Sequence, residues 1–341
     1  MGVKIFSTAK SVPIAEKISR SYGKKLAKSN IKVFSDGEFC HGLDENVRGE
    51  KVFIIASLFS SFNYINDILE YVPKENHDII KNKLRSIVSS SDSVFDLLQM
   101  IDAAKRASAR EIIAVIPYFG WARQDRKDRP RVPITAKLLS NLIENAGATR
   151  IMSIDLHADQ IQGFFDIPVD ALTSMFVFAP YIESLNFGKT LIIGSPDEGG
   201  GKRIKPYSDF FNTKMIFMYK ERSAANVINN MELIGNVNGK NVVFVDDIID
   251  TAGTITTAAD ILINEKGAQS VRACITHPVL SGPAYERIKK SKITEIIVTD
   301  TIPLTNYCEK IKVISVADMI AKSIYKMNTN ESISTLFDFK K

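Results

Sequence analysis

The sequence predicts an α/β fold with two similar domains, each a mostly parallel sheet flanked by helices. Short runs of β-branched and aromatic residues alternate along the chain with segments of helical spacing. The order strand, helix, strand at residues 51–116 is repeated at residues 241–275. The 341 residues suffice for two domains of ordinary size, which we place at residues 1–170 and 171–315, followed by a C-terminal segment at 316–341.

The composition is that of a soluble globular protein, with 45% hydrophobic and 24% charged residues. A net charge of +5 could indicate nucleic acid but suits anionic small substrates equally well, and no helix-turn-helix, zinc-finger or RNA-binding signature accompanies it. The longest apolar run, at residues 52–59, is far too short to span a bilayer. We therefore expect a cytoplasmic protein with no nucleic-acid partner and no membrane partner.

The first domain is expected to alternate strands and helices in chain order. Its strands are predicted at residues 3–6, 31–34, 51–56, 112–116 and 150–154, and its helices at 13–22, 94–107 and 135–146. The pair Asp36-Gly37 predicts a turn between the strands at 31–34 and 51–56.

The second half of the chain repeats this alternation. Its strands are predicted at residues 190–194, 215–218, 242–245, 271–276, 295–298 and 312–315, with one helix at 255–263 and a last helix ending near residue 325. Three consecutive glycines, at residues 199–201, follow the first of these strands and indicate a close approach of the backbone to a ligand.

The most informative stretch is the end of the strand at 242–245 and the turn that follows it. Its acidic pair, Asp246 and Asp247, needs hydroxyl groups or a cation as partner and so suits a ribose diol or Mg²⁺. The small-residue turn before the next helix presents backbone N–H groups and hydroxyls at a helix N-terminus, where negative charge is favoured. The turn consists of Asp250, Thr251, Ala252, Gly253 and Thr254. These features together predict a phosphate site beside an acidic pair.

Residues 243–254 resemble the phosphoribosyl-diphosphate loop of the type I phosphoribosyltransferase superfamily. With the segments at 34–38, 123–131, 155–165 and 195–200, the chain resembles the ribose-phosphate diphosphokinases over nearly its whole length. The resemblance implies two phosphoribosyltransferase-like domains. It also implies transfer of the diphosphoryl group of Mg-ATP to the 1-hydroxyl of ribose 5-phosphate, for nucleotide biosynthesis.

Site residues are carried over from the family position by position. The resemblance implies that Lys220 and Arg222 are catalytic and that His157 and Asp197 contact the Mg²⁺ of Mg-ATP. It assigns ATP contacts to Phe34, Asp36, Glu38, Arg123, Gln124 and Asp128. It assigns ribose 5-phosphate to Asp246, Asp247, Asp250, Thr251, Ala252, Gly253 and Thr254.

The residues at 34–38 reach across a subunit interface in the family. The resemblance therefore implies a homo-oligomer, at least a dimer, with a hexamer as the family's assembly.

Two features depart from the family pattern. Residues 59–92 are expected to form a surface insertion of two short helices, at 64–71 and 78–88, before a serine run restarts the core helix. Ala171 stands where the family has asparagine, near an allosteric site of relatives, so the resemblance leaves regulation by ADP open.

Three other interpretations stay open. A phosphoribosyltransferase would share the phosphate turn but would consume phosphoribosyl diphosphate. A catalytically silent regulatory subunit is suggested by the insertion, although the chain keeps Lys220, Arg222, His157 and the acidic pair. The third is a nucleic-acid-binding role, to be tested by salt-dependent binding to oligonucleotides.

Overall fold

The computed structural model describes residues 2–59, 90–224 and 227–336, and the chain forms two compact units. The first unit runs to Leu172 and also includes Ala317–Ile333. The second unit comprises Thr173–Val316 and the end of the described chain from Ser334. The helices expected at 64–71 and 78–88 lie outside the described residues.

The first unit is built on a five-stranded sheet whose strands are all parallel, in the order β1-β4-β5-β6-β7. These strands are β1 (Val3–Ser7), β4 (Lys51–Ile55), β5 (Glu111–Ile116), β6 (Arg150–Ile154) and β7 (Val169–Leu172). Its main helices are α1 (Val12–Tyr22), α4 (Ser90–Arg106), α5 (Thr135–Ala146) and α10 (Ala317–Thr329). Helix α10 packs against α1, so residues after the second unit complete the first.

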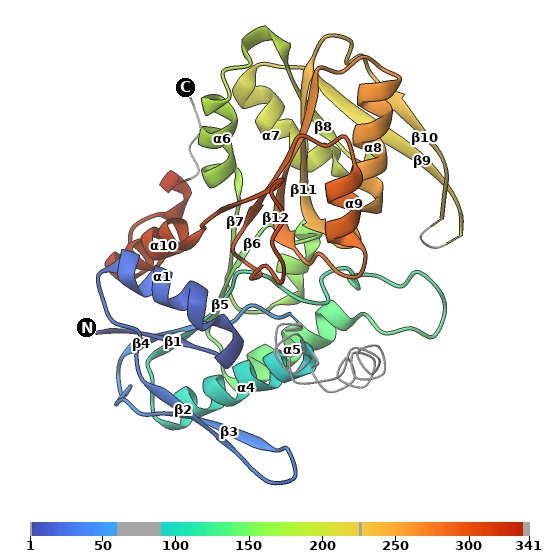
Figure 1. The fold of residues 1–341 in the computed structure, drawn as a ribbon. Coiled ribbons are helices and arrows are strands. Elements are labelled where there is room, and N and C mark those ends of the chain that lie inside the picture. The colour runs from blue at the N-terminus through green and yellow to red at the C-terminus, as the bar shows by residue number, and fades with distance from the viewer. Residues whose placement is uncertain (1, 60–89, 225–226, 337–341) are drawn as a thin grey trace. The chain divides into compact units, whose positions relative to one another are not determined.

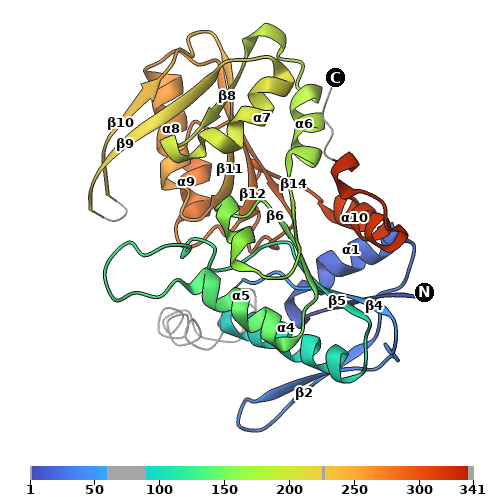
Figure 2. The ribbon, with the colours of Figure 1, turned by 180° about the vertical axis from the view of Figure 1, so that it is seen from behind.

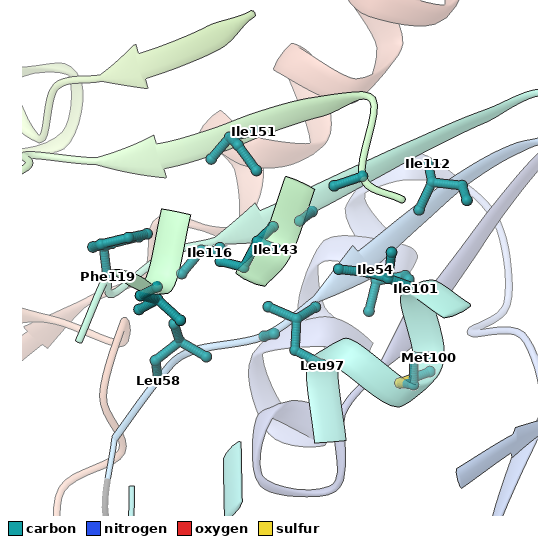
Figure 3. Close-up of a cluster of buried hydrophobic side chains, with 14 of the residues drawn as sticks. Ile54, Leu58, Leu97, Met100, Ile101, Ile112, Ile116, Phe119, Ile143 and Ile151 are labelled. Carbon is teal, nitrogen blue, oxygen red and sulfur yellow. The ribbon is translucent and has the colours of Figure 1, made fainter. Parts of the chain in front are cut away.

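Both faces of this sheet are buried, which explains the continuous apolar runs of its strands. Val52 and Ile54 of β4 belong to a core layer formed with α4 and α5, whereas the equally buried Phe53 and Ile55 do not. Figure 3 shows this layer, in which Ile54, Ile112 and Ile151 of the strands lie with Leu97 and Met100 of α4 and Ile143 of α5. Helices α1 and α10 lie on the opposite face, as Figures 1 and 2 show from two sides.

A separate hairpin joins β2 (Ser29–Val33) to β3 (Phe39–Leu43) as a two-stranded antiparallel sheet. Its turn uses Gly37 with a φ of 94°, a conformation that favours glycine. The turn expected at Asp36-Gly37 is therefore present, but the strand that follows it is β3 and not residues 51–56. Strand β3 was not predicted from the sequence, because only His41 of its five residues is buried and the strand has no apolar pattern.

The second unit is built on a seven-stranded sheet in the order β10-β9-β8-β11-β12-β13-β14. All neighbours are parallel except β9 and β10, which form an antiparallel hairpin. The strands are β8 (Leu191–Ser195), β9 (Met215–Ala224), β10 (Val227–Ile234), β11 (Asn241–Ile249), β12 (Ser270–Pro278), β13 (Glu295–Thr299) and β14 (Ile311–Ile314). The helices are α6 (Met175–Ser184), α7 (Gly201–Phe211), α8 (Gly253–Asn264) and α9 (Ala284–Lys290).

This sheet also separates two core layers. Val242 and Phe244 of β11 pack in the layer of α8 and α9, and Val243 and Val245 pack in the layer of α6 and α7. The central strand β11 is longer than expected, since it continues through the acidic pair to Ile249. Helices α6, α7 and α9 were not predicted. Helices α6 and α7 each contain an internal proline, Pro180 or Pro206, which is unfavourable in a helix interior, and α9 has only seven residues.

Candidate active site

Most of the predicted residues of the second unit lie along one edge of its sheet. Strands β9, β8 and β11 are parallel neighbours, so the residues at their carboxyl ends share an edge. Asp197 follows β8, the acidic pair and the turn lie at the end of β11, and Lys220 and Arg222 lie in β9 beyond Phe217, which pairs with the end of β8. The structure thus places Asp197, the acidic pair and the turn at one edge, whereas Lys220 and Arg222 lie farther along the β9–β10 hairpin, opposite Met231 and Ile228.

The acidic pair is bridged by Arg203 from α7. One guanidinium nitrogen, Nη1, lies 2.8 Å from Oδ1 of Asp246, and the other, Nη2, lies 3.0 Å from Oδ1 of Asp247. The three side chains are 22%, 17% and 5% exposed, respectively. The fork geometry of arginine suits two carboxylates at once and makes these charge-assisted contacts strong.

The electrostatics of the pair are governed by burial. Burial raises the pKa of Asp246 well above the ordinary value of 3.8, and the charges of Asp247 and Asp197 add to this rise. Arg203 acts in the opposite direction by favouring the ionised form. The edge therefore holds carboxyl groups whose ionised forms a cation or hydroxyl donors would stabilise.

The turn after β11 has the geometry of an anion-binding loop. We call residues 250–254 the phosphate loop. Ala252 occupies the left-handed region with φ 59° and ψ 2°, and α8 begins at the next residue, Gly253. The hydroxyl of Thr256 donates to the carbonyl of Ala252 at 2.8 Å. The first N–H groups of a helix have no acceptor within it, so they are available to an anion at this end.

The glycines after β8 permit a tight connection near Asp197. A Cβ added to Gly200 would lie 2.2 Å from Oγ of Ser195 and 3.9 Å from Oδ1 of Asp197. No side chain fits there without displacing Ser195, which is fully buried. The glycine run therefore lets the backbone pass close to β8. It then continues into α7, which carries Arg203.

In the first unit, the predicted residues follow the neighbouring strands β5 and β6. Arg123, Gln124 and Asp128 are exposed on the segment after β5, and His157 is exposed after β6. The two segments touch, because the side-chain amide of Gln160 donates to Asp125 at 3.0 Å. The side-chain oxygen of Gln124 accepts from the hydroxyl of Thr135 at 2.5 Å, which holds it at the start of α5.

Phe34, Asp36 and Glu38 lie apart from that edge, at the exposed tip of the β2–β3 hairpin. The backbone N–H of Phe34 donates to the carbonyl of Glu38 at 2.7 Å, which closes the turn. Oδ1 of Asp36 accepts from the N–H of Glu38 at 3.0 Å, so one carboxylate oxygen already stabilises the turn. The amino group of Lys32 lies 4.9 Å from the centre of the Phe34 ring.

Sequence reasoning gave Arg203 no role. It lies 43 residues before Asp246 in the chain, and an arginine in the first turn of a helix gives no signal of its partner. Its place after the glycine run, close to a strand end, is the one feature that could have drawn attention to it.

The carboxylates at the strand ends of the second unit suit Mg²⁺. This ion prefers oxygen ligands and binds through one or two carboxylates together with substrate phosphates. Burial raises the pKa of Asp246, and the nearby charges of Asp247 and Asp197 raise it further, so a cation bound here would stabilise the ionised carboxylates. Within residues 2–59, 90–224 and 227–336, no three His, Cys, Asp or Glu side chains form a ready-made metal cluster. None of the helices in these ranges is long and apolar enough to cross a membrane.

Two largely parallel sheets flanked by helices, with an acidic pair and a phosphate loop at the end of strand β11, are typical of a phosphoribosyltransferase-like class of protein. Family models agree with this. The N-terminal domain of ribose phosphate pyrophosphokinase matches residues 3–147, and the phosphoribosyl synthetase-associated domain matches residues 196–338.

Curated relatives are similar over almost the full length. Ribose-phosphate pyrophosphokinase from Porphyromonas gingivalis is 47% identical over 335 residues, covering 98% of this chain and 97% of that protein. The Campylobacter jejuni enzyme of the same name is 47% identical over 336 residues, covering 98% and 99%. The crystal structure of phosphoribosylpyrophosphate synthetase from Mycobacterium smegmatis matches with a TM-score of 0.82 at 32% identity, covering 97% of this chain and all of that one. The chain belongs to the ribose-phosphate pyrophosphokinase family. This confirms the ribose-phosphate diphosphokinase family expected from residues 243–254 together with the segments at 34–38, 123–131, 155–165 and 195–200.

Proposed function

We propose that this protein transfers the diphosphoryl group of Mg-ATP to the 1-hydroxyl of D-ribose 5-phosphate. The products are 5-phosphoribosyl 1-diphosphate and AMP, and the reaction serves nucleotide biosynthesis. The observation that carries the proposal is the 47% identity to ribose-phosphate pyrophosphokinases across 98% of the chain. Relatives with this name favour an active enzyme over a silent regulatory subunit or a phosphoribosyltransferase.

Ribose 5-phosphate would bind at the end of β11. Its 5-phosphate would accept hydrogen bonds from N–H groups and hydroxyls of the phosphate loop, and its ribose hydroxyls would donate to Asp246 and Asp247. Arg203 supports this role, because it fixes both carboxylates in one orientation before the sugar arrives. A prearranged site avoids the entropy cost of ordering these groups during the reaction.

Attack of the 1-hydroxyl on the β-phosphorus requires alignment and charge neutralisation more than covalent help from the protein. Lys220 and Arg222 would supply positive charge where the transition state accumulates negative charge. His157 and Asp197 would contact the Mg²⁺ of the nucleotide, which neutralises phosphate oxygens when bound.

ATP would be bound by two groups of side chains of the first unit. Arg123, Gln124 and Asp128 would contact the nucleotide from the segment after β5. Phe34 offers a stacking face for adenine, and the carboxylates of Asp36 and Glu38 can accept from its exocyclic amine. The exposure of the hairpin tip suits a contact with a neighbouring chain, so we propose a homo-oligomer, at least a dimer and, as the family suggests, a hexamer. We propose that it acts in the cytoplasm.

The test is AMP release from Mg-ATP with and without ribose 5-phosphate, for the wild type, Lys220→Ala and Lys214→Ala. Lys214 is exposed just before β9 and loses the same charge, so it is the matched control. We expect ribose-dependent AMP release that falls by about 10²–10³-fold in Lys220→Ala only. A folded, oligomeric wild type that releases no AMP would overturn the proposal and favour the regulatory subunit.

A further inference from the structure

The phosphate loop is supported from behind by a segment that the proposed mechanism does not use. We call residues 280–287, between the end of β12 and the middle of α9, the backing segment. The N–H of Leu280 donates to the carbonyl of Ile249 at 3.0 Å, and the N–H of Ser281 donates to the carbonyl of Asp250 at 3.1 Å. Nη1 of Arg287 donates to the carbonyl of Thr251 at 3.0 Å. Three consecutive carbonyls therefore accept hydrogen bonds from the same segment.

This arrangement determines where the loop's N–H groups point. In a planar trans peptide, the C=O and the N–H of one unit point in opposite directions. Because the carbonyls of Asp250 and Thr251 face the backing segment, the N–H groups of Thr251 and Ala252 face away from it. Successive N–H groups that point to one side form a concave site for an anion. The backing segment thus sets the orientation of the donors that a phosphate would meet.

Arg287 differs from the other donors of the backing segment, because it is a charged side chain. It comes from α9, which contributes Ala284 and Ile288 to the core layer of α8. Figure 1 shows the two helices side by side. Nη1 of Arg287 lies 3.1 Å from the position that a Cβ on Gly253 would occupy. The guanidinium therefore lies directly against the loop, and the absence of a side chain at Gly253 leaves room for it.

The charge of Arg287 matters because the neighbouring groups are acidic. The phosphate loop contains Asp250 and no basic residue, and Asp246 and Asp247 precede it. Ser281 donates through its hydroxyl to the carboxylate of Asp250 and so partly satisfies that group. A dianionic phosphate still approaches a strand end with three carboxylates, and a guanidinium with four further N–H hydrogens offsets part of that repulsion.

We propose that Arg287 is a positioning residue for the 5-phosphate of a pentose phosphate. It holds the Thr251–Ala252 peptide with its N–H facing the phosphate, and its charge favours a phosphorylated sugar over an uncharged one. This inference rests on the proposed role of the phosphate loop in binding ribose 5-phosphate. It adds selectivity for the phosphate group to the recognition of the ribose by the acidic pair.

The test compares Arg287→Met, Arg287→Lys and the control Lys290→Met by steady-state kinetics with each substrate varied in turn. Lys290 lies on the same helix, so Lys290→Met removes one positive charge from α9 as Arg287→Met does. Its side chain is 81% exposed and lies 3.7 Å from Glu286, so little structure depends on it. We expect Arg287→Met to raise the KM for ribose 5-phosphate by about tenfold to a hundredfold, the range for a lost charged hydrogen bond. The KM for Mg-ATP should stay within about twofold, and Arg287→Lys should recover part of the loss because it keeps the charge.

The outcomes separate this inference from the proposed function. A wild type without ribose-dependent turnover contradicts the proposed function and the inference together. A wild type with normal turnover, alongside an Arg287→Met variant that matches Lys290→Met, overturns the inference alone. An Arg287→Met variant that raises both KM values equally, or lowers only kcat, shows a merely structural role and also overturns it.

A second variant tests the geometry directly. Gly253→Ala places a methyl group against Arg287, so it should raise the KM for ribose 5-phosphate mainly by displacing the guanidinium. In the Arg287→Met background, the factor by which Gly253→Ala raises this KM should be at least threefold smaller than in the wild type. The effects of neighbouring groups that act together are not additive. Equal costs in both backgrounds would contradict a role through this contact.

Discussion

The two strand–helix–strand repeats of the chain have the same design but different ends. In the first unit, β4 leads to α4 and then β5, and in the second unit β11 leads to α8 and then β12. Both first strands are buried on both sides. Val52 and Ile54 of β4 pack in the layer of α4 and α5, and β11 divides the two core layers of its unit. Alternate residues of each strand face alternate layers, which is what a sheet covered on both faces requires.

The difference begins immediately after the fifth residue of each strand. Ala56 and Ser57 follow β4, whereas Asp246 and Asp247 occupy the corresponding places in β11. Ala56 is completely buried and packs in the α4 layer, while the two aspartates share Arg203. The fold thus depends on the apolar pattern within the strand, and the site depends on the few residues that come next.

The comparison predicts that the two strands contribute similarly to stability. Phe53→Ala and Phe244→Ala should each lower the free energy of unfolding by about 3–5 kcal/mol, because each removes a fully buried ring from a packed layer. Urea denaturation followed by circular dichroism measures both. Tyr307→Ala, at a side chain 91% exposed, is the control and should stay within about 0.5 kcal/mol. A loss below about 1 kcal/mol in either phenylalanine variant would break the equivalence.

The second prediction concerns the charges that only the second unit has at its strand end. Arg203→Met leaves two adjacent carboxylates without their shared cation, and we expect it to destabilise the protein by about 3 kcal/mol at pH 8. The pKa of Asp246 is already raised above 3.8, and it should rise further in this variant. Protonation of Asp246 stabilises the folded protein fully below pH 3.8, the ordinary pKa of the group, and this contribution is lost as the pH rises through the raised pKa of the folded protein. The loss of unfolding free energy in Arg203→Met should therefore be smaller at pH 5 than at pH 8.

Urea denaturation at both pH values measures this dependence. Arg203→Lys keeps the charge but not the fork, and should fall between the wild type and Arg203→Met. Equal losses at pH 5 and pH 8 would show that Arg203 acts by packing alone.

The smallest effect is expected at the glycines after β8. Gly200→Ala should cost about 1–3 kcal/mol, because its methyl group would overlap the buried Ser195. Gly199→Ala is the matched control, since the nearest atom to its added Cβ is Oδ1 of Asp197 at 3.4 Å, an ordinary contact distance. Thermal unfolding of the two variants checks this. Equal losses would mean that the glycine run does not serve the close approach to β8.

The parts of the fold that the sequence predicted well are those with a clear period. Residues 135–146 and 150–154 carry unbroken helical and strand patterns, and α5 and β6 have these bounds. The pattern was less useful for the β9–β10 hairpin, where only the first four residues of β9 were expected and β10 was missed. There, pairing between strands and not local preference decides the structure.

For the site, sequence reasoning placed Asp197, the acidic pair and the phosphate loop at strand ends, and the structure brings them to one edge. It could not find Arg203 or Arg287, because both act through contacts with residues distant in the chain. Arg203 is 43 residues from Asp246, and Arg287 is 36 residues from Thr251. A single arginine on a helix carries no mark of such a partner, so only the folded arrangement reveals it.

The central claim is that the strand end of the second unit, unlike its counterpart in the first, binds the sugar phosphate. Calorimetric titration with ribose 5-phosphate, in the presence of Mg²⁺ and α,β-methylene-ATP, tests it without turnover. The variants are Asp247→Asn and, at the corresponding position of the first unit, Ser57→Ala. The Ser57 hydroxyl is buried without a hydrogen-bond partner among the described residues, so its loss should be harmless.

We predict that the wild type and Ser57→Ala bind with the same Kd and that Asp247→Asn binds at least about tenfold more weakly, as expected when a charged hydrogen bond is lost. Unchanged binding by Asp247→Asn, with wild-type stability, would contradict the account.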